Sequence, residues 1–184
     1  MDADVLTWPE LTDITEKLAA AVAADPVPDV IVGILRGGMV PAVLLAHRLG
    51  VRDVRALPIT HTRYDGVNAP KTERPMLAYP GSVGRLEGRD VLVVDDVMGS
   101  GDTLEAACDH LAGQGARRIR SAICLRNRAN QPVADTDAHG TGAGAGAGAD
   151  VAGDGGGGGG GEARIPTYLG REIQRWVVFP WEQP

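Results

Sequence analysis

Hydrophobic positions near the start of the chain recur at the spacing of an α-helix. The apolar residues of this stretch are Leu11, Ile14, Leu18 and Val22. Thr7 can cap such a helix, Pro9 fits its first turn, and Glu10 completes a capping box. The pattern therefore predicts a helix that begins after Thr7 and stops in the proline-containing segment 24–28.

The next segments alternate between short apolar runs and a helical pattern. Residues 29–35 predict a buried strand, because they contain the apolar run Val30, Ile31, Val32 and Ile34. Residues 41–49 predict a short helix that ends at Gly50, and residues 54–60 predict a second strand. Together these elements make one βαβ unit.

A second unit of the same kind follows. Residues 90–95 predict a strand rich in Val and Leu, residues 96–102 a loop, residues 103–111 a helix, and residues 119–125 another strand. Strands that alternate with helices indicate an α/β fold with a doubly wound, mainly parallel sheet. A last short apolar strand is predicted at 176–179.

Two stretches lack this periodicity. Residues 61–87 carry turn formers and charges, and we expect a loop whose part 61–76 closes over a site; it contains Arg63, Tyr64, Lys71 and Arg74. Residues 134–163 are rich in Gly and Ala and include seven consecutive glycines. We expect this insert to be flexible, within a single domain that covers residues 1–184.

Composition and charge exclude several classes of protein. With 184 residues, 43% of them hydrophobic and 23% charged, the chain is typical of a globular domain. The formal net charge of −6 argues against general binding of nucleic acid. No apolar run approaches the roughly 20 residues of a membrane span, and the acidic start is unlike a signal peptide. We therefore expect a cytoplasmic protein, with Cys108 and Cys124 as reduced core thiols.

The segment after the strand 90–95 carries the strongest chemical signal. The strand ends in Asp95 and Asp96, and the loop then supplies two glycines and hydroxyl groups before a helix begins. A helix N-terminus at the carboxyl edge of a parallel sheet suits a phosphate, and glycines let the backbone approach it. Two adjacent carboxylates favour a second duty there, which is to hold sugar hydroxyls or Mg²⁺. The Gly-Lys-Ser/Thr ending of a Walker loop is absent.

Residues 93–104 resemble the phosphoribosyl pyrophosphate loop of type I phosphoribosyltransferases. The resemblance implies that Asp95 and Asp96 meet the ribose hydroxyls and a Mg²⁺ cofactor. It also implies a cradle for the 5′-phosphate made of Met98, Gly99, Ser100, Gly101, Asp102 and Thr103. The family fold further implies a small hood built from the N- and C-terminal segments, and a homo-oligomer, either dimer or tetramer.

Two further segments extend the resemblance. Arg36, Gly37 and Gly38 are similar to the family's pyrophosphate-binding loop, in which the peptide Leu35–Arg36 is the place to look for a cis bond. With Asp95 and Asp96, Arg36 is the residue to which the resemblance assigns a part in catalysis.

The C-terminal segment 176–182 resembles that of 6-oxopurine phosphoribosyltransferases, especially the xanthine-guanine type and small archaeal relatives. The resemblance implies that Trp176 stacks on a purine and that Val177 reads its edge. Packing in the core is the alternative for both terminal tryptophans, and we favour it for Trp181.

Two positions depart from the 6-oxopurine pattern. Gly99 stands where that group has an aspartate that acts as general acid/base, and Arg126 stands where a lysine binds the 6-oxo group. We predict an enzyme that transfers the phosphoribosyl group to a xanthine, guanine or hypoxanthine base in purine salvage. An enzyme of the same fold that acts on another base, and a non-catalytic regulator that senses phosphoribosyl pyrophosphate, stay open as alternatives.

Overall fold

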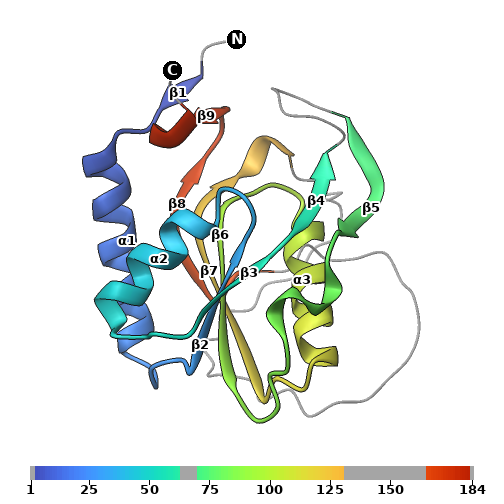
Figure 1. Ribbon diagram of the computed structural model, residues 1–184. Coiled ribbons are helices and arrows are strands. Elements are labelled where there is room, and N and C mark those ends of the chain that lie inside the picture. The colour runs from blue at the N-terminus through green and yellow to red at the C-terminus, as the bar shows by residue number, and fades with distance from the viewer. Residues whose placement is uncertain (1–2, 63–69, 131–164, 183–184) are drawn as a thin grey trace, which may run out of the picture.

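The three predicted helices are all present, and their ends follow local sequence signals (Figure 1). The structure is a computed structural model that describes residues 3–62, 70–130 and 165–182. Its helices are α1 (Trp8–Ala23), α2 (Met39–Leu49) and α3 (Asp102–Gly113). At the start of α1, Glu10 N donates to Thr7 Oγ1 and Thr7 N donates to Glu10 Oε2, which completes the expected capping box. At the end of α2, Gly50 takes the left-handed conformation with φ 70°.

A parallel sheet of five strands forms the centre of the described chain. Its strands, in spatial order, are β3 (Val54–Leu57), β2 (Val30–Ile34), β6 (Asp90–Met98), β7 (Arg118–Asn127) and β8 (Tyr168–Ile173). Every neighbouring pair is parallel. Helices α1 and α2 cover one face and α3 covers the other (Figure 1). The predicted doubly wound α/β fold is therefore confirmed.

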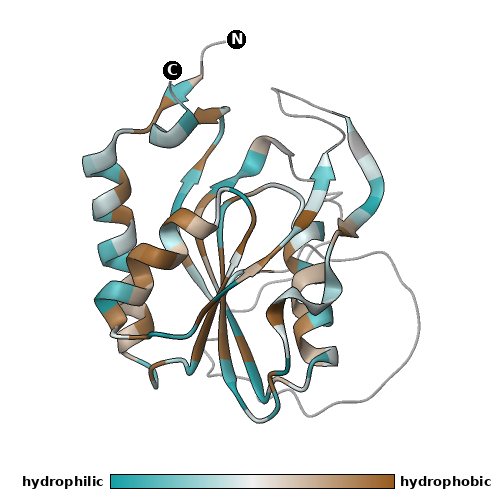
Figure 2. Cartoon of the chain, in the orientation of Figure 1, coloured by the Kyte–Doolittle hydropathy of each residue, from teal (hydrophilic) through white to brown (hydrophobic). Residues whose placement is uncertain are grey.

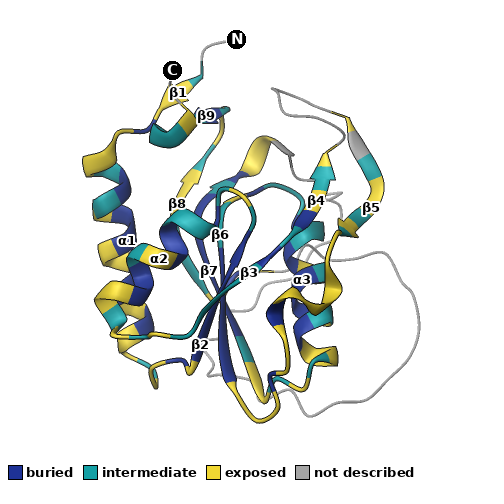
Figure 3. Cartoon of the chain, viewed as in Figure 1, coloured by how far each residue is buried: buried dark blue, intermediate teal, exposed yellow. Residues whose placement is uncertain are grey.

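The central strands supply both hydrophobic layers (Figures 2 and 3). Along β6, Leu92 and Val94 belong to the core under α1 and α2, whereas Val91 and Val93 belong to the core under α3. All four side chains are fully buried, which explains why the strand reads as a continuous apolar run. Both cysteines are buried and free, as expected. Among the described helices, none is both long and apolar enough to cross a bilayer.

The chain termini meet beside the edge of the central sheet. Strands β1 (Asp4–Val5) and β9 (Val177–Val178) pair in parallel, and Leu6 N donates to Val178 O at 2.9 Å. This pair, with the short helical turn Pro180–Glu182, is the predicted hood. Trp181 stacks on Phe179 with ring centroids 4.6 Å apart, which supports its expected packing role.

The structure differs from the sequence-based expectation in three places. The predicted strand 54–60 is divided, because only residues 54–57 belong to the central sheet and residues 59–60 begin a strand of a separate sheet. Strand β8 was not predicted, because its sequence contains two charges and a glycine and its edge position leaves it half exposed. Gly170 is needed there, since a Cβ would lie 2.6 Å from Cys124 O. The segment 61–87 also holds structure: β4 (Ile59–Thr62) and β5 (Lys71–Leu77) form an antiparallel pair. Arg63, Tyr64 and the insert 134–163 lie outside the described residues.

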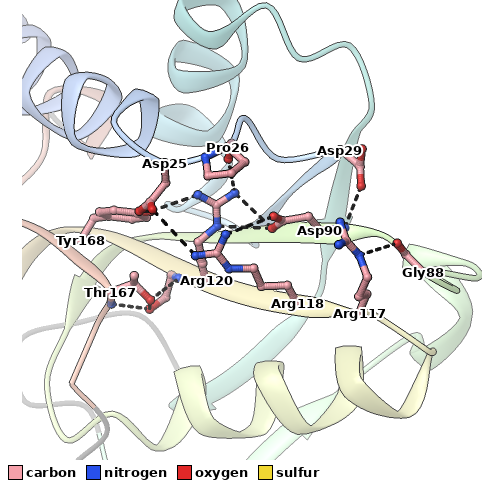
Figure 4. A network of polar contacts seen from close by, with 11 residues as sticks. Asp25, Pro26, Asp29, Gly88, Asp90, Arg117, Arg118, Arg120, Thr167 and Tyr168 are labelled. Carbon is pink, nitrogen blue, oxygen red and sulfur yellow. Dashed lines mark hydrogen bonds and ion pairs between the residues drawn. The ribbon is translucent and has the colours of Figure 1, made fainter. Parts of the chain in front are cut away.

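A buried polar network secures β8 at the amino end of the sheet (Figure 4). Arg120 is 3% exposed and contacts Asp90 Oδ1 at 3.1 Å. It also donates to Tyr168 Oη at 3.0 Å, and Tyr168 in turn donates to Asp25 Oδ2. Because Tyr168 is the first residue of β8, these contacts fix where the chain re-enters the sheet and leads to the hood.

Candidate active site

A cavity of about 250 Å³ lies at the carboxyl ends of the central strands and reaches the hood. Ligands of open α/β sheets bind at this edge. Its walls come from β4, from the end of β6 with the following loop, from β7 and β8, and from the C-terminal segment. The lining residues are His61, Thr62, Asp95, Asp96, Val97, Met98, Gly99, Ser100, Gly101, Thr103, Leu104, Asn127, Ile173, Trp176, Val177, Phe179 and Glu182.

Asp95 and Asp96 place two carboxylates side by side on this wall. The strand is longer than predicted, so Asp96 lies within β6 together with Asp95 rather than in the loop after it. Asp95 Oδ1 accepts from Asp96 N at 3.0 Å, and Asp96 Oδ1 accepts from Val97 N at 2.8 Å. Burial, and then the charge of Asp96, raise the pKa of Asp95 well above its ordinary value. Burial raises the pKa of Asp96 to about 6, and the nearby charge of Glu182 acts in the same direction. Such a pair is prepared to bind a cation or hydroxyl groups.

The loop after β6 leads directly into the N-terminus of α3. Gly101 is the N-cap residue, with φ 94°, and has no side chain with which to cap the helix. The amide groups of the first turn, which starts at Asp102, are therefore suited to an anion. Gly99, Ser100 and Thr103 share the same cavity wall with the carboxylate pair. The structure thus brings the predicted phosphate cradle and the predicted ribose site together.

The loop after β2 packs against this carboxylate pair. The peptide Leu35–Arg36 is cis, at the position where the sequence resemblance indicated one. A Cβ on Gly37 would overlap the carboxylate of Asp96. A Cβ on Gly38 would lie 2.6 Å from Val94 O. Arg36 is exposed and is not among the cavity-lining residues.

The far end of the cavity is aromatic and apolar. Trp176 and Val177 line it together with Ile173 and Phe179. Trp176 is half buried, which leaves its ring available to a flat ligand. This arrangement agrees with the expected positions of Trp176 and Val177.

Arg126 is a predicted site residue that does not line the cavity, as is also true of Arg36, Gly37, Gly38 and Asp102. The guanidinium of Arg126 is 3.9 Å from Glu172 Oε1. The adjacent residue Asn127 lines the cavity instead, because successive side chains of a strand point to opposite faces. The side chain of Asn127 is held in place by a hydrogen bond in which its Nδ2 donates to Arg175 O at 3.2 Å.

Sequence reasoning gave no individual role to four polar residues of the cavity, which are His61, Thr62, Asn127 and Glu182. Asn127 directly follows the predicted residue Arg126, and Glu182 is the last residue of the predicted segment 176–182. A polar side chain at each of these positions was the signal that could have identified them. Glu182 Oε2 accepts from Phe179 N at 2.9 Å. His61 Nε2 lies 3.1 Å from Asp102 Oδ2, although the two residues are far apart in the sequence. No periodicity around His61 pointed to that pairing.

Comparisons with known proteins agree with this geometry. The chain is 36% identical over 76 residues to the xanthine-guanine phosphoribosyltransferase of Ruegeria sp., a match that spans 41% of this chain and only 43% of that relative. The purine phosphoribosyltransferase of Pyrococcus horikoshii has a similar structure, with a TM-score of 0.70 and 27% identity over 100% of this chain and 96% of its own.

A Neisseria gonorrhoeae protein with bound ppGpp shares the fold, with a TM-score of 0.68, 19% identity and coverage of 100% and 92% of the two chains. The family described as the phosphoribosyl transferase domain matches residues 3–141. That match covers the carboxylate pair, the glycine loop and both βαβ units, and the chain belongs to this phosphoribosyl transferase family.

Proposed function

We propose that the protein transfers the 5-phosphoribosyl group from phosphoribosyl pyrophosphate to a 6-oxopurine base. One observation carries the proposal: a single cavity holds the carboxylate pair Asp95–Asp96, the glycine loop at the start of α3, and the half-buried ring of Trp176. The first two features suit a phosphorylated sugar, and the third suits a flat heterocycle.

The phosphoribosyl half of the substrate fits the β6–α3 end of the cavity. The 5′-phosphate binds the amides of residues 99–103, where the helix start favours negative charge. Asp95 and Asp96 accept from the ribose hydroxyls. The loop 36–38 contacts the same carboxylates and therefore binds the leaving pyrophosphate, with Arg36 turning inward from its exposed position.

The carboxylate pair also fits Mg²⁺ as the cofactor. Mg²⁺ is held through one or two protein carboxylates together with substrate phosphates and water, and it needs no larger cluster of protein ligands. Burial next to another carboxylate makes each charge of the pair costly without a cation, as the raised pKa values of Asp95 and Asp96 indicate. The ion would supply charge stabilisation to the departing pyrophosphate.

In the proposed reaction an unprotonated ring nitrogen of the base forms a bond to C1 of the ribose while the bond from C1 to the pyrophosphate oxygen breaks. The base releases the proton of its other imidazole nitrogen to water or to the departing pyrophosphate. Positive charge develops on the sugar ring, as in other reactions at an anomeric carbon. The chain contributes mainly by holding both reactants in line. The hairpin β4–β5 covers one side of the cavity through His61 and Thr62 and helps to exclude water.

The base lies between Trp176 and the polar groups of the hood. Trp176 stacks on the ring, and the backbone of Val177 reads its edge. Glu182 lines the same region, and its carboxylate accepts from the N1–H and 2-amino groups of guanine but repels the 2-oxo group of xanthine. We therefore propose guanine as a better substrate than xanthine. Asn127 faces the cavity and is placed to meet the 6-oxo group; the same role for Arg126 stays a prediction, and it requires the side chain to leave Glu172.

A base panel tests this proposal. Guanine, hypoxanthine, xanthine, adenine and uracil are each incubated with phosphoribosyl pyrophosphate and Mg²⁺, and pyrophosphate release is followed. We expect turnover with 6-oxopurines, with guanine ahead of xanthine. Turnover confined to another base would move the protein to a different specificity. Tight binding of phosphoribosyl pyrophosphate without turnover of any base would favour the regulatory alternative.

A further inference from the structure

Asn127 joins the end of β7 to the backbone just before Trp176. It is the last residue of β7, and it lies opposite Ile173 where the β7–β8 ladder ends. Asn127 is 5% exposed. Its Nδ2 donates to Arg175 O at 3.2 Å, and its Oδ1 accepts from Ala129 N at 3.0 Å. The side chain therefore continues the attachment of the C-terminal segment to β7 beyond the point where the ladder stops.

These two hydrogen bonds fix the orientation of the Asn127 amide. One partner is a backbone carbonyl, which only accepts, and the other is a backbone N–H, which only donates. A flipped amide would place oxygen against oxygen and N–H against N–H. Nδ2 carries a second N–H, so the bond to Arg175 O leaves a donor for the 6-oxo contact proposed above. Holding the backbone and meeting the base are therefore separate properties of one side chain.

The segment that receives this bond lies between two strands. Residues 174–176 connect β8 to β9 and belong to neither of them. Arg175 O is held by Asn127 of β7, and Trp176 O accepts from Asp4 N of β1 at 2.9 Å. These two carbonyls belong to the peptide groups on either side of the Trp176 Cα. Because the allowed directions of a side chain depend on φ and ψ, holding both peptide groups restricts where the indole ring can point.

We propose that Asn127 is a positioning residue for base binding, which holds the backbone before Trp176 so that the indole ring is ready to stack on a purine. This inference rests on the proposed function, since it assumes that the base stacks on Trp176. Asn127 acts here through Arg175 O. A ring that is already ordered does not have to lose conformational freedom when the ligand binds. Loss of the bond should therefore weaken ligands that carry a purine and spare those that carry only the sugar phosphate.

Two probes separate the two halves of the site. Guanosine 5′-monophosphate carries base, ribose and 5′-phosphate, whereas ribose 5-phosphate lacks the base. In calorimetry, Asn127→Ala should bind guanosine 5′-monophosphate roughly three- to tenfold more weakly, which corresponds to one neutral hydrogen bond, and ribose 5-phosphate about as well as the wild type.

Ser121→Ala is the matched control. Ser121 also lies on β7 and is 6% exposed, and its Oγ accepts from Thr167 N at 3.0 Å. This bond likewise attaches the chain beside β8 to β7, but near the amino end of the sheet and outside the cavity lining. We expect Ser121→Ala to lower the melting temperature and to leave the affinity for both probes unchanged.

The fluorescence of Trp176 tests the positioning role without any ligand. The chain has three tryptophans, so Trp8→Phe with Trp181→Phe leaves Trp176 as the single indole. In this background Asn127→Ala should make Trp176 more accessible to quenching by acrylamide. Asn127→Asp should do the same, because its carboxylate still accepts from Ala129 N but places an oxygen against Arg175 O. Ser121→Ala should be quenched like the parent protein.

Each other outcome overturns the proposal. Weaker binding of guanosine 5′-monophosphate with unchanged quenching of Trp176 would mean that Asn127 acts on the base directly. An equal loss for ribose 5-phosphate, or an equal loss in Ser121→Ala, would trace the effect to general damage of the sheet. Unchanged quenching in Asn127→Asp would show that the bond to Arg175 O does not hold the ring. If the wild type binds neither probe, the proposed function fails as well. Wild-type binding of both probes with unchanged affinities in Asn127→Ala removes the role of Asn127 alone.

Discussion

Gly37 and Asp96 touch across the cavity edge so closely that any side chain at position 37 would overlap the Asp96 carboxylate. The two residues lie on different strand ends, one after β2 and the other near the end of β6. Strands β2 and β6 pair in parallel with Gly33 opposite Val94, and this pairing brings the two strand ends together. The contact means that the proposed pyrophosphate loop and the proposed ribose and metal site form one unit.

Gly37→Ala should therefore damage binding more than stability. The added methyl group must displace the side chain of Asp96, which can rotate away at small cost to the fold. We expect the affinity for Mg²⁺ and phosphoribosyl pyrophosphate to fall about tenfold or more, since a charged interaction is lost. Calorimetry and thermal melting measure the two effects separately.

Gly38→Ala is the matched comparison. Here a Cβ would lie 2.6 Å from Val94 O and 2.7 Å from Ile34 O, so the backbone itself must shift. We expect a loss of about 1–3 kcal/mol in the free energy of unfolding. Equal melting temperatures for the two variants would contradict this distinction.

Asp96→Asn should have opposite effects on stability and on binding. Burial raises the pKa of Asp96 from its ordinary value of 3.8 to about 6 in the folded protein. A carboxyl group with a raised folded pKa favours the native state when protonated, and this contribution is lost as the pH rises from about 4 through about 6. Above that range the ionised group destabilises the protein in the absence of Mg²⁺.

Asparagine stays neutral and can still accept from Val97 N. We therefore expect Asp96→Asn to raise the free energy of unfolding by about 1–3 kcal/mol at pH 7.5 without ligand, with a smaller gain at pH 4.5. The same variant should lose Mg²⁺-dependent binding of phosphoribosyl pyrophosphate, and so should Asp95→Asn. Unchanged affinity in both variants would refute the proposed site.

Arg120→Leu should destabilise the protein without altering the cavity directly. The change leaves Asp90, which is 4% exposed, buried without its main cation (Figure 4). Breaking a buried pair from one side costs about 3–5 kcal/mol. Arg85→Leu is the control, because its pair with Glu87 is exposed and should contribute less than about 1 kcal/mol. Chemical denaturation of both variants compares them.

The sequence alone predicted the elements whose residues follow a local rule. The capping box at Thr7 and the apolar run of β6 depend on neighbours along the chain, and both were predicted correctly. Asp95, Asp96 and the glycine loop were found because their motif is contiguous. Strand β8 was missed because an edge strand carries polar side chains, and its place depends on Arg120, far away in the sequence.

The same reasoning explains which parts of the site could not be predicted. His61 meets Asp102 only because β4 packs on α3, and no local pattern encodes that contact. The choice between Arg126 and Asn127 depends on which face of β7 turns toward the cavity. Because side chains alternate between the two faces of β7, moving the aligned motif by one residue exchanges Arg126 for Asn127. The assignment of the base-binding role to Arg126 therefore depended on the exact alignment of the motif.

Gly99→Asp addresses the side chain that the 6-oxopurine pattern has and this chain lacks. Gly99 lines the cavity in the same loop as the proposed phosphate cradle. The glycines with positive φ in the described chain are Gly50, Gly84, Gly88, Gly101 and Gly115, and Gly99 is not among them. Its backbone therefore accepts a side chain without the strain that the same change would cause at Gly101.

An aspartate at position 99 would supply a general acid or base near the ring nitrogens of a bound purine. Such help is typically worth about 10²–10⁴-fold in rate, so the wild type should turn over purines slowly for its family. We expect Gly99→Asp to raise turnover with guanine, xanthine or hypoxanthine and to leave the KM for phosphoribosyl pyrophosphate nearly unchanged, because the amides of the cradle stay in place.

Gly101→Asp serves as the control, since its strained backbone should disrupt the cradle and raise that KM. Steady-state kinetics of the three proteins across the three bases decide the matter. A fast wild type together with a slower Gly99→Asp on every base would mean that proton transfer in this enzyme does not use the position. Failure of both proteins on all three bases would leave the phosphoribosyl site in place and direct the search to another base or to a regulatory role.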